Sequence, residues 1–288
     1  MRYYETTENL RHYIQEDDEK RLVAVDVPYG THVCQRCDIC IPKNLSGDAG
    51  LILYIHGGGF LHGDKAGYME SIKSDSENGF VCASVNYRFA DAETGIDDMM
   101  EDITHALILI RNIAEQYGVS LHRMLLTGGS AGAHLLLLYA YTQVDTAPIR
   151  PAAAVAYCPS TNVAERKMIF DTRIGCPENM AILFSHLSKY PFTPDTFTSA
   201  VPALEKISSY FYVHADTVPT VIAHGLLDDC VPFDQAQMLD EKLEEYGVPH
   251  KLIVYPNSGH ALERDPDKAA QTHELLIAFA EKYLTGKP

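Results

Sequence analysis

One glycine- and serine-containing stretch constrains this chain more than any other feature. Gly128-Gly129-Ser130-Ala131-Gly132 follows the apolar run Met124 to Leu126 and opens a second apolar run, Ala133 to Tyr139. This pattern predicts a strand, a sharp turn and a helix, with the serine at the turn. Glycines two residues before and two residues after the serine would let the turn pack closely against neighbouring backbone. An ordinary glycine-rich loop before a helix has the same pattern, so other parts of the chain must decide between the two interpretations.

The remaining hydrophobic pattern predicts strands that alternate with helices. We expect strands at residues 21–27, 32–41, 51–55, 80–85, 124–126, 152–157, 219–224 and 251–255, and helices at 97–117, 133–139, 234–246 and 266–284. Several of these strands are continuous apolar runs, which is typical of strands covered on both faces. The alternation predicts an α/β fold with an open, mostly parallel sheet and helices on both faces.

The chain as a whole predicts one domain. Its 288 residues contain no repeat, no low-complexity tract and no linker between two differently patterned halves. We therefore expect a single α/β domain over residues 1–288. A long stretch without an obvious pattern, at about 158–218, is expected to be an irregular insertion.

Charge and composition narrow the range of partners. The chain has 23 basic and 39 acidic residues and a formal net charge of −16, so its average field repels phosphate backbones and anionic lipid surfaces. No run approaches the ~20 apolar residues of a membrane span, and the first residues lack the apolar core of a secretory signal. We expect no nucleic-acid or membrane partner and a cytoplasmic location. The sequence does not indicate the oligomeric state.

The cysteines favour reduced thiols over disulfides or a metal site. There are seven, an odd number without a secretory signal. Cys34, Cys37 and Cys40 have metal-motif spacing, but an extended strand would place Cys37 on the face opposite the other two. We therefore expect no metal.

A catalytic interpretation of Ser130 needs a histidine base and a carboxylate that orients it, because a serine hydroxyl is a weak nucleophile. In this architecture both follow the serine, carboxylate first. His260 follows the expected strand 251–255 and is the best placed of the 13 histidines. Asp228 and Asp229 follow the strand 219–224, and only one of them can face the histidine. We favour Asp228, which leaves Asp229 to face solvent or cap a turn.

A second glycine-rich segment lies directly after the strand 51–55. In His56-Gly57-Gly58-Gly59-Phe60, consecutive glycines let backbone amides approach a substrate without a Cβ in the way. Such amides stabilise the negative charge that develops on oxygen in a tetrahedral intermediate. The amide of Ala131, directly after the serine, is expected to join them.

Taken together, the motifs resemble the α/β-hydrolases of the hormone-sensitive-lipase and acetyl-esterase type. The motifs that carry the resemblance are His56 to Phe60, Asn86-Tyr87-Arg88, Gly128 to Gly132, His224-Gly225 with Asp228 and Val231-Pro232, and Gly259-His260. The resemblance implies Ser130 as nucleophile, His260 as general base and then acid, and Asp228 as its orienting carboxylate.

The same resemblance also implies supporting roles for other motif residues. Gly58, Gly59 and Ala131 would form the oxyanion hole. His56 and Asn86-Tyr87-Arg88 would support the site rather than react. Gly129 stands where the family commonly has an acidic residue, and Ala133 stands where it commonly has another glycine, which leaves the subfamily open.

The resemblance and the layout also suggest a substrate. Only about twenty residues precede the first expected strand, so we expect no N-terminal helical cap of the kind that many lipase-like members have. The insertion at about 158–218 is then expected to supply the lid. Most of its aromatic residues would pack its own small core, whereas Phe60, next to the glycines, would line the acyl side of the pocket. A small lid favours a carboxylesterase for short acyl groups, acetyl groups on a sugar included, as in the compact acetylxylan and feruloyl esterase branch.

Two other interpretations stay open. The same triad could serve an amidase, such as an arylformamidase, or a peptidase, because the sequence does not show how His260 lies relative to a leaving amine. A hydrolase fold kept as a binding module is the non-enzymatic alternative, although such modules typically lose a triad residue or an oxyanion glycine. No cofactor is expected, since Ser130 and His260 supply the nucleophile and the base.

Overall fold

The computed structural model describes residues 7–171 and 175–285. The strands are β1 (Ile14–Asp17), β2 (Arg21–Pro28), β3 (Arg36–Pro42), β4 (Gly47–Ile55), β5 (Val81–Val85), β6 (Val119–Gly129), β7 (Arg150–Tyr157), β8 (Thr220–Gly225) and β9 (His250–Tyr255). The α-helices are α1 (Met69–Ser76), α2 (Ile96–Gln116), α3 (Ala131–Thr142), α4 (Arg166–Phe170), α5 (Pro177–Ser188), α6 (Phe197–Lys206), α7 (Asp234–Glu245) and α8 (Pro266–Leu284). Short 3₁₀ helices lie at η1 (Thr7–His12), η2 (Lys65–Tyr68), η3 (Pro194–Thr196) and η4 (Ser209–Tyr212).

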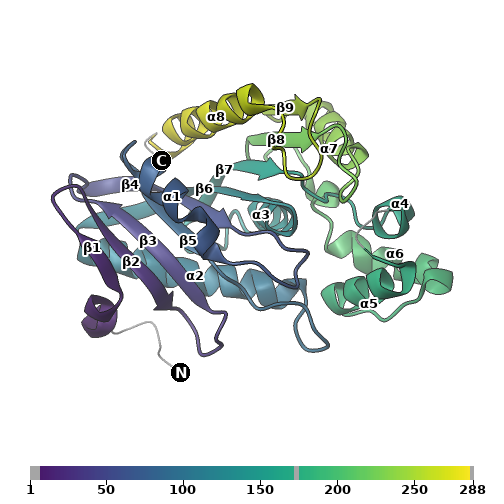
Figure 1. Ribbon diagram of the computed structural model, residues 1–288, viewed down its shortest axis with the longest axis horizontal. Helices are drawn as coiled ribbons and strands as arrows, with labels where there is room; N and C mark the ends of the chain where they lie inside the picture. Colours follow the sequence, from purple (N-terminus) through teal and green to yellow (C-terminus); the bar gives the residue numbers. More distant parts are fainter. Residues whose placement is uncertain (1–6, 172–174, 286–288) are drawn as a thin grey trace.

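All nine strands form one sheet, in the order β1-β2-β3-β5-β4-β6-β7-β8-β9 (Figure 1). The neighbouring pairs from β1 to β5 are antiparallel, and those from β5 to β9 are parallel. The parallel strands therefore end at one edge of the sheet, where sites form in folds of this kind. The predicted α/β class with a mostly parallel sheet is confirmed.

Each face of the sheet has its own hydrophobic core. Along β4, Leu51, Leu53 and Ile55 pack with the helices α2, α3 and α7, whereas Ile52 and Tyr54 pack with α1 and α8. This alternation is the period-two geometry of a strand buried on both faces. No helix in the described part of the chain is both long enough and apolar enough to span a membrane.

The expected elements are present, although several differ in their extent. The strand expected from residue 32 begins at Arg36, because the preceding residues form a turn in which Gln35 N–H bonds the carbonyl of His32. As a result Cys34 lies outside the strand, while Cys37 and Cys40 pack in the cores on opposite faces. The strand before the serine is longer than the expected one and begins at Val119.

The segment at about 158–218 was expected to be irregular, and this prediction is wrong. It contains the helices α4, α5 and α6, which lie together at one end of the molecule, beyond α3 (Figure 1). The segment contains several prolines, which disfavour the interior of a helix and therefore argued against helices here. Pro177 begins α5, Pro194 begins η3, and Pro202 lies inside α6.

Candidate active site

Ser130 lies at a strained turn between β6 and α3. Its backbone has φ 56° and ψ −122°, a conformation that non-glycine residues rarely adopt. The turn lies directly against the end of β4: a Cβ on Gly128 or on Gly132 would come within 2.1 Å of the carbonyl oxygen of Ile55. The expectation that small residues flank the serine because the backbone packs closely is thus confirmed.

The structure brings Ser130, His260 and Asp228 together from three different strand ends. Nε2 of His260 lies 2.9 Å from Oγ of Ser130, and Nδ1 of His260 lies 2.7 Å from Oδ2 of Asp228. Because a carboxylate only accepts hydrogen bonds, Nδ1 carries the proton and Nε2 is free to accept the serine proton. Asp228 therefore faces the histidine, as predicted, and the neighbouring Asp229 is exposed.

The carboxylate of Asp228 is fully buried and accepts three hydrogen bonds, and the imidazole of His224 lies beside it. Oδ1 accepts hydrogen bonds from the backbone amides of Cys230 and Val231, each at 2.9 Å. Oδ2 accepts a hydrogen bond from Nδ1 of His260 at 2.7 Å. It also lies 3.3 Å from Nε2 of His224, whose shorter contact, at 2.9 Å, is with the carbonyl of Val231. Burial alone would raise the pKa of Asp228, but the side chains of His224 and His260 hold it well below its usual range. The carboxylate is therefore ionised at neutral pH.

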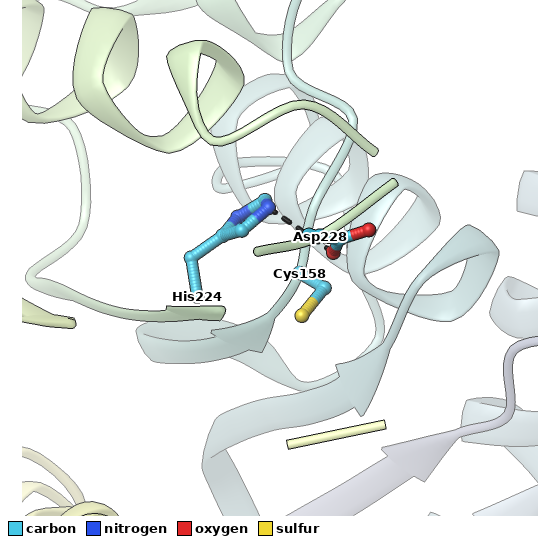
Figure 2. Close-up of side chains that lie close together, drawn as sticks. All are labelled: Cys158, His224 and Asp228. Carbon is cyan, nitrogen blue, oxygen red and sulfur yellow. Dashed lines mark ion pairs between the residues drawn. The ribbon is translucent and has the colours of Figure 1, made fainter. Parts of the chain in front are cut away.

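His224 and two cysteines surround this carboxylate. The side chain of Cys158 lies beside the pair formed by His224 and Asp228 (Figure 2), and ligand atoms of these three residues lie within 4.8 Å of one another. The same holds for Asp228, Cys230 and His260. A metal could bind either group only in place of the hydrogen bonds that Asp228 makes. Burial also raises the pKa of the Cys158 thiol, which disfavours the thiolate that a metal requires.

The glycine-rich segment after β4 lies against the serine turn. A Cβ on Gly57 would be 3.1 Å from the Cβ of Ser130. Gly58 and Gly59 have φ of 112° and 60°, in the left-handed region that favours glycine, and Phe60 continues it with φ 65°. Within the described residues, the backbone amides of Gly58 and Gly59 donate to no other backbone carbonyl, so they remain available to a ligand.

Tyr87 contacts the start of this segment, whereas the neighbouring Arg88 pairs with α2. The hydroxyl of Tyr87 donates to the carbonyl of His56 at 2.9 Å, and its ring stacks on the imidazole of His56 with centroids 4.5 Å apart. Arg88 forms an ion pair with the buried Asp102 of α2 at 2.8 Å. These contacts fix the loop geometry without reaching the reacting atoms.

Phe60 lies differently from the prediction. Its ring is buried and packs edge-on against His134, with centroids 5.3 Å apart, and its carbonyl accepts a hydrogen bond from the amide of Ala90. It is not among the residues that line the cavity beside Ser130. With its backbone in the left-handed region, the side chain points into the core, so Phe60 anchors the glycine segment instead of lining the pocket.

A cavity of about 520 Å³ opens beside Ser130 and His260. Its walls come from the face of the sheet that α1 and α8 cover, and its aromatic lining is Tyr54, Tyr68, Tyr157 and Tyr255. Among the described residues of the segment 158–218, only Cys158 lines this cavity. The prediction that this segment supplies the lid therefore fails for this cavity, because α4, α5 and α6 pack at the other face.

The aromatic residues of that segment instead pack against one another. The ring of Phe197 contacts those of Phe170 and Phe192, with centroids 5.5 and 6.1 Å apart. Phe184 is buried in the same core. These rings pack together as expected, but their core is continuous with the one that contains α2 and α3, so the segment has no separate small core.

Comparison with known proteins places this arrangement in a family. The BD-FAE family model matches residues 37–243, which contain the glycine segment, Ser130 and Asp228. The chain belongs to the BD-FAE family. It is 28% identical over 283 residues to "Probable carboxylic ester hydrolase LipM" of Mycobacterium tuberculosis (strain ATCC 25618 / H37Rv), which covers 90% of this chain and 61% of LipM. A shorter match, 31% identical over 129 residues, is to "Kynurenine formamidase" of Danio rerio, with 43% of this chain and 42% of that protein covered.

Solved structures agree on the fold of this BD-FAE protein. "Truncated form of carbohydrate esterase from gut microbiota" superposes with a TM-score of 0.73 at 19% identity and covers 93% of this chain and 99% of that chain. The resemblance to an α/β-hydrolase is thereby confirmed at the level of fold. The chain spans between half and three fifths of the length of the first curated relatives it matches, at 61%, 50% and 61%.

Sequence reasoning missed the residues that shape the cavity. Tyr54, Tyr157 and Tyr255 lie at or next to the carboxyl ends of β4, β7 and β9, so the rule that predicted the triad could also have found them. His224, whose imidazole lies beside Asp228, had the same signal. His273 of α8 had none, because the chain pattern does not reveal that its helix lies over the site.

Proposed function

We propose that this chain is a serine carboxylesterase that hydrolyses short-chain esters of small substrates, acetyl esters first among them, through an acyl-enzyme on Ser130. The observation that carries the proposal is the hydrogen-bonded series from Ser130 through His260 to Asp228, with distances of 2.9 and 2.7 Å. It lies at one edge of the sheet, beside glycine amides and a cavity of substrate size. The similarity to a probable carboxylic ester hydrolase supports the same activity.

In the proposed acylation step, Oγ of Ser130 attacks the ester carbonyl carbon while Nε2 of His260 takes the serine proton. The carbonyl oxygen becomes an oxyanion and accepts hydrogen bonds from the amides of Gly58, Gly59 and Ala131. The intermediate collapses, the bond to the alcohol breaks, and His260 returns its proton to the leaving alcohol. Asp228 stabilises the imidazolium without taking its proton.

Deacylation repeats these steps with water. His260 takes a proton from water, whose oxygen attacks the acyl carbon, and then returns the proton to Oγ of Ser130 as the acid leaves. Ser130, His260 and the backbone amides supply every group that these steps need. The proposal therefore requires no metal or other cofactor.

The size of the cavity favours small substrates. A volume of about 520 Å³ lies within the range of small-molecule sites, ~300–1,000 Å³. The tyrosine-rich wall offers both apolar rings and hydroxyl groups, which suits an alcohol with polar substituents. We include acetylated sugars among the substrates on this basis.

A series of p-nitrophenyl esters tests the acyl preference. We expect kcat/KM to be highest for acyl chains of two to four carbons and to fall steadily with length. An optimum above about eight carbons would overturn the short-chain proposal. An acetylated monosaccharide assayed beside the series tests the sugar substrate directly.

Labelling with a fluorophosphonate probe tests the chemistry itself. The wild-type protein should be labelled and S130A should not, because the probe reacts only with an activated serine. An unlabelled wild-type protein would favour the binding-module alternative. The variant S199A, which removes an exposed serine of α6, provides the control and should label like wild type.

A formamidase is the second candidate, and the match to kynurenine formamidase favours it. Hydrolysis of an amide releases an amine, a poor leaving group that must be protonated as it leaves. The same triad can therefore hydrolyse amides and esters at very different rates. Rates on phenyl acetate and formanilide separate the two. Faster hydrolysis of formanilide would replace the esterase proposal.

A further inference from the structure

A second histidine–carboxylate pair borders the cavity that contains Ser130. Nε2 of His273, on α8, donates a hydrogen bond to Oδ1 of Asp75, on α1, at 2.8 Å. The hydroxyl of Tyr54, near the end of β4, donates to the other oxygen, Oδ2. His273 and Tyr54 both line the cavity, whereas Asp75 lies behind them with an exposed fraction of 1%.

Burying a carboxylate is costly unless donors satisfy it. Asp75 has both oxygens satisfied, and both donors are cavity residues from different elements of the fold. The side chain of His273, by contrast, is 52% exposed. A buried acid that fixes an exposed imidazole repeats the arrangement by which Asp228 orients His260, and packing α8 against α1 would not require it.

The hydrogen bond to Asp75 also determines what His273 can offer. The carboxylate only accepts, so Nε2 of His273 carries the proton. In the neutral ring, Nδ1 then presents a lone pair, and within the described residues the structure gives Nδ1 no partner. The cavity wall therefore holds an oriented hydrogen-bond acceptor among tyrosine rings.

We propose that His273 determines specificity by accepting a hydrogen bond from a hydroxyl group on the alcohol part of the ester. This inference rests on the proposed function. If the acyl group is as small as acetyl, most of the cavity of about 520 Å³ holds the alcohol part, and His273 lies on its wall. Asp75 and Tyr54 keep the imidazole in place. The substrate class is therefore an ester of a hydroxyl-bearing alcohol, such as a partly acetylated sugar.

Two substrates that differ only in hydrogen-bond donors test this proposal. One is a mono-acetylated methyl xyloside with free hydroxyl groups, and the other is the same ester with those hydroxyl groups methylated. The readout is the ratio of kcat/KM for the two. In H273L this ratio should fall about 3- to 10-fold relative to wild type, the range of one hydrogen bond. H273Q, whose amide oxygen can still accept, should lose less.

The matched control is H122L, which removes an exposed histidine paired with Asp48 outside the cavity. Its ratio should equal that of wild type. An unchanged ratio in H273L would overturn the inference. If kcat/KM falls equally on both substrates, the ratio is also unchanged, and the role of His273 is purely structural. If wild type hydrolyses p-nitrophenyl acetate in either case, the proposed function stands. If wild type hydrolyses no ester, the proposed function itself fails.

Discussion

Replacing Asp228 by asparagine should nearly abolish activity, because the hydrogen bonds that the Asp228 carboxylate accepts also fix the tautomer of His260. Asparagine can keep its oxygen toward the backbone amides of Cys230 and Val231, but its NH₂ group then faces the N–H group of His260. To accept a hydrogen bond from this NH₂ group, the imidazole of His260 must carry its proton on Nε2. That nitrogen can then no longer take the proton of Ser130.

We expect kcat on p-nitrophenyl acetate to fall about 10⁴-fold in D228N, the loss found when the base is held in the wrong tautomer. The matched control is D229N, because Asp229 is the adjacent carboxylate and is exposed. We expect its kcat to stay within about threefold of wild type, as for most surface substitutions. Equal losses in the two variants, or a D228N variant within tenfold of wild type, would refute the assignment of Asp228.

Acid unfolding of the same variant checks the electrostatic part of the argument. Because the pKa of Asp228 is lowered in the folded state, its charge contributes stability that is present above the unfolded pKa of about 3.9 and is lost as the pH falls toward the folded value. Wild type and D228N should therefore differ most in free energy of unfolding at neutral pH and converge below about pH 4. A difference independent of pH would contradict this.

Three further substitutions test the surroundings of the site. G132A should lower kcat about 100-fold, because its Cβ would lie 2.1 Å from the carbonyl oxygen of Ile55 and the serine turn must shift to avoid it. Steady-state kinetics measure the loss of kcat, and thermal unfolding shows whether the variant is folded. Burial lowers the pKa of His134 to about 4, so protonation of this residue should cost wild type up to about 3 kcal/mol of its free energy of unfolding between pH 6.5 and 4. H134Q has no titrating group at this position and should not show this loss in urea unfolding. K65M leaves the carboxylate of Asp38 buried without its partner at 2.8 Å and should cost about 3–5 kcal/mol in urea unfolding, whereas a loss below about 1 kcal/mol would show that the pair is not needed.

The candidate site could be predicted because its residues lie at strand ends. Ser130, Asp228 and His260 each follow an apolar strand, and parallel strands end at one edge of the sheet, so chain order alone predicts that the three meet. The two glycine-rich segments were predicted for a different reason. Close approach of backbone excludes a Cβ, and this leaves a direct trace in the sequence.

Packing between distant helices leaves no such trace. Asp75 and His273 are 198 residues apart and meet only because α1 and α8 cover the same face of the sheet. The helix α5 escaped prediction for a related reason: its apolar residues, such as Leu183 and Leu187, lie in a segment divided by prolines. Phe197, which shares a core with these residues, lies in another helix of that segment. The spacing of apolar residues along α5 alone therefore did not indicate a helix.

The position of the cavity follows from the alternation of strand residues. At the end of β4, Ile55 faces the core under α2 and α3, and the preceding Tyr54 faces α1 and α8. The cavity opens on the second face because the helices there leave tyrosines, rather than close-packed aliphatic residues, beside the serine turn. A lid formed by α4, α5 and α6 would have to cover the opposite face, where α3 already fills the space with buried leucines. Under the proposed function we therefore expect substitutions on α8 facing the cavity to alter the ratio of kcat/KM between substrates more than substitutions in α4, α5 or α6 do.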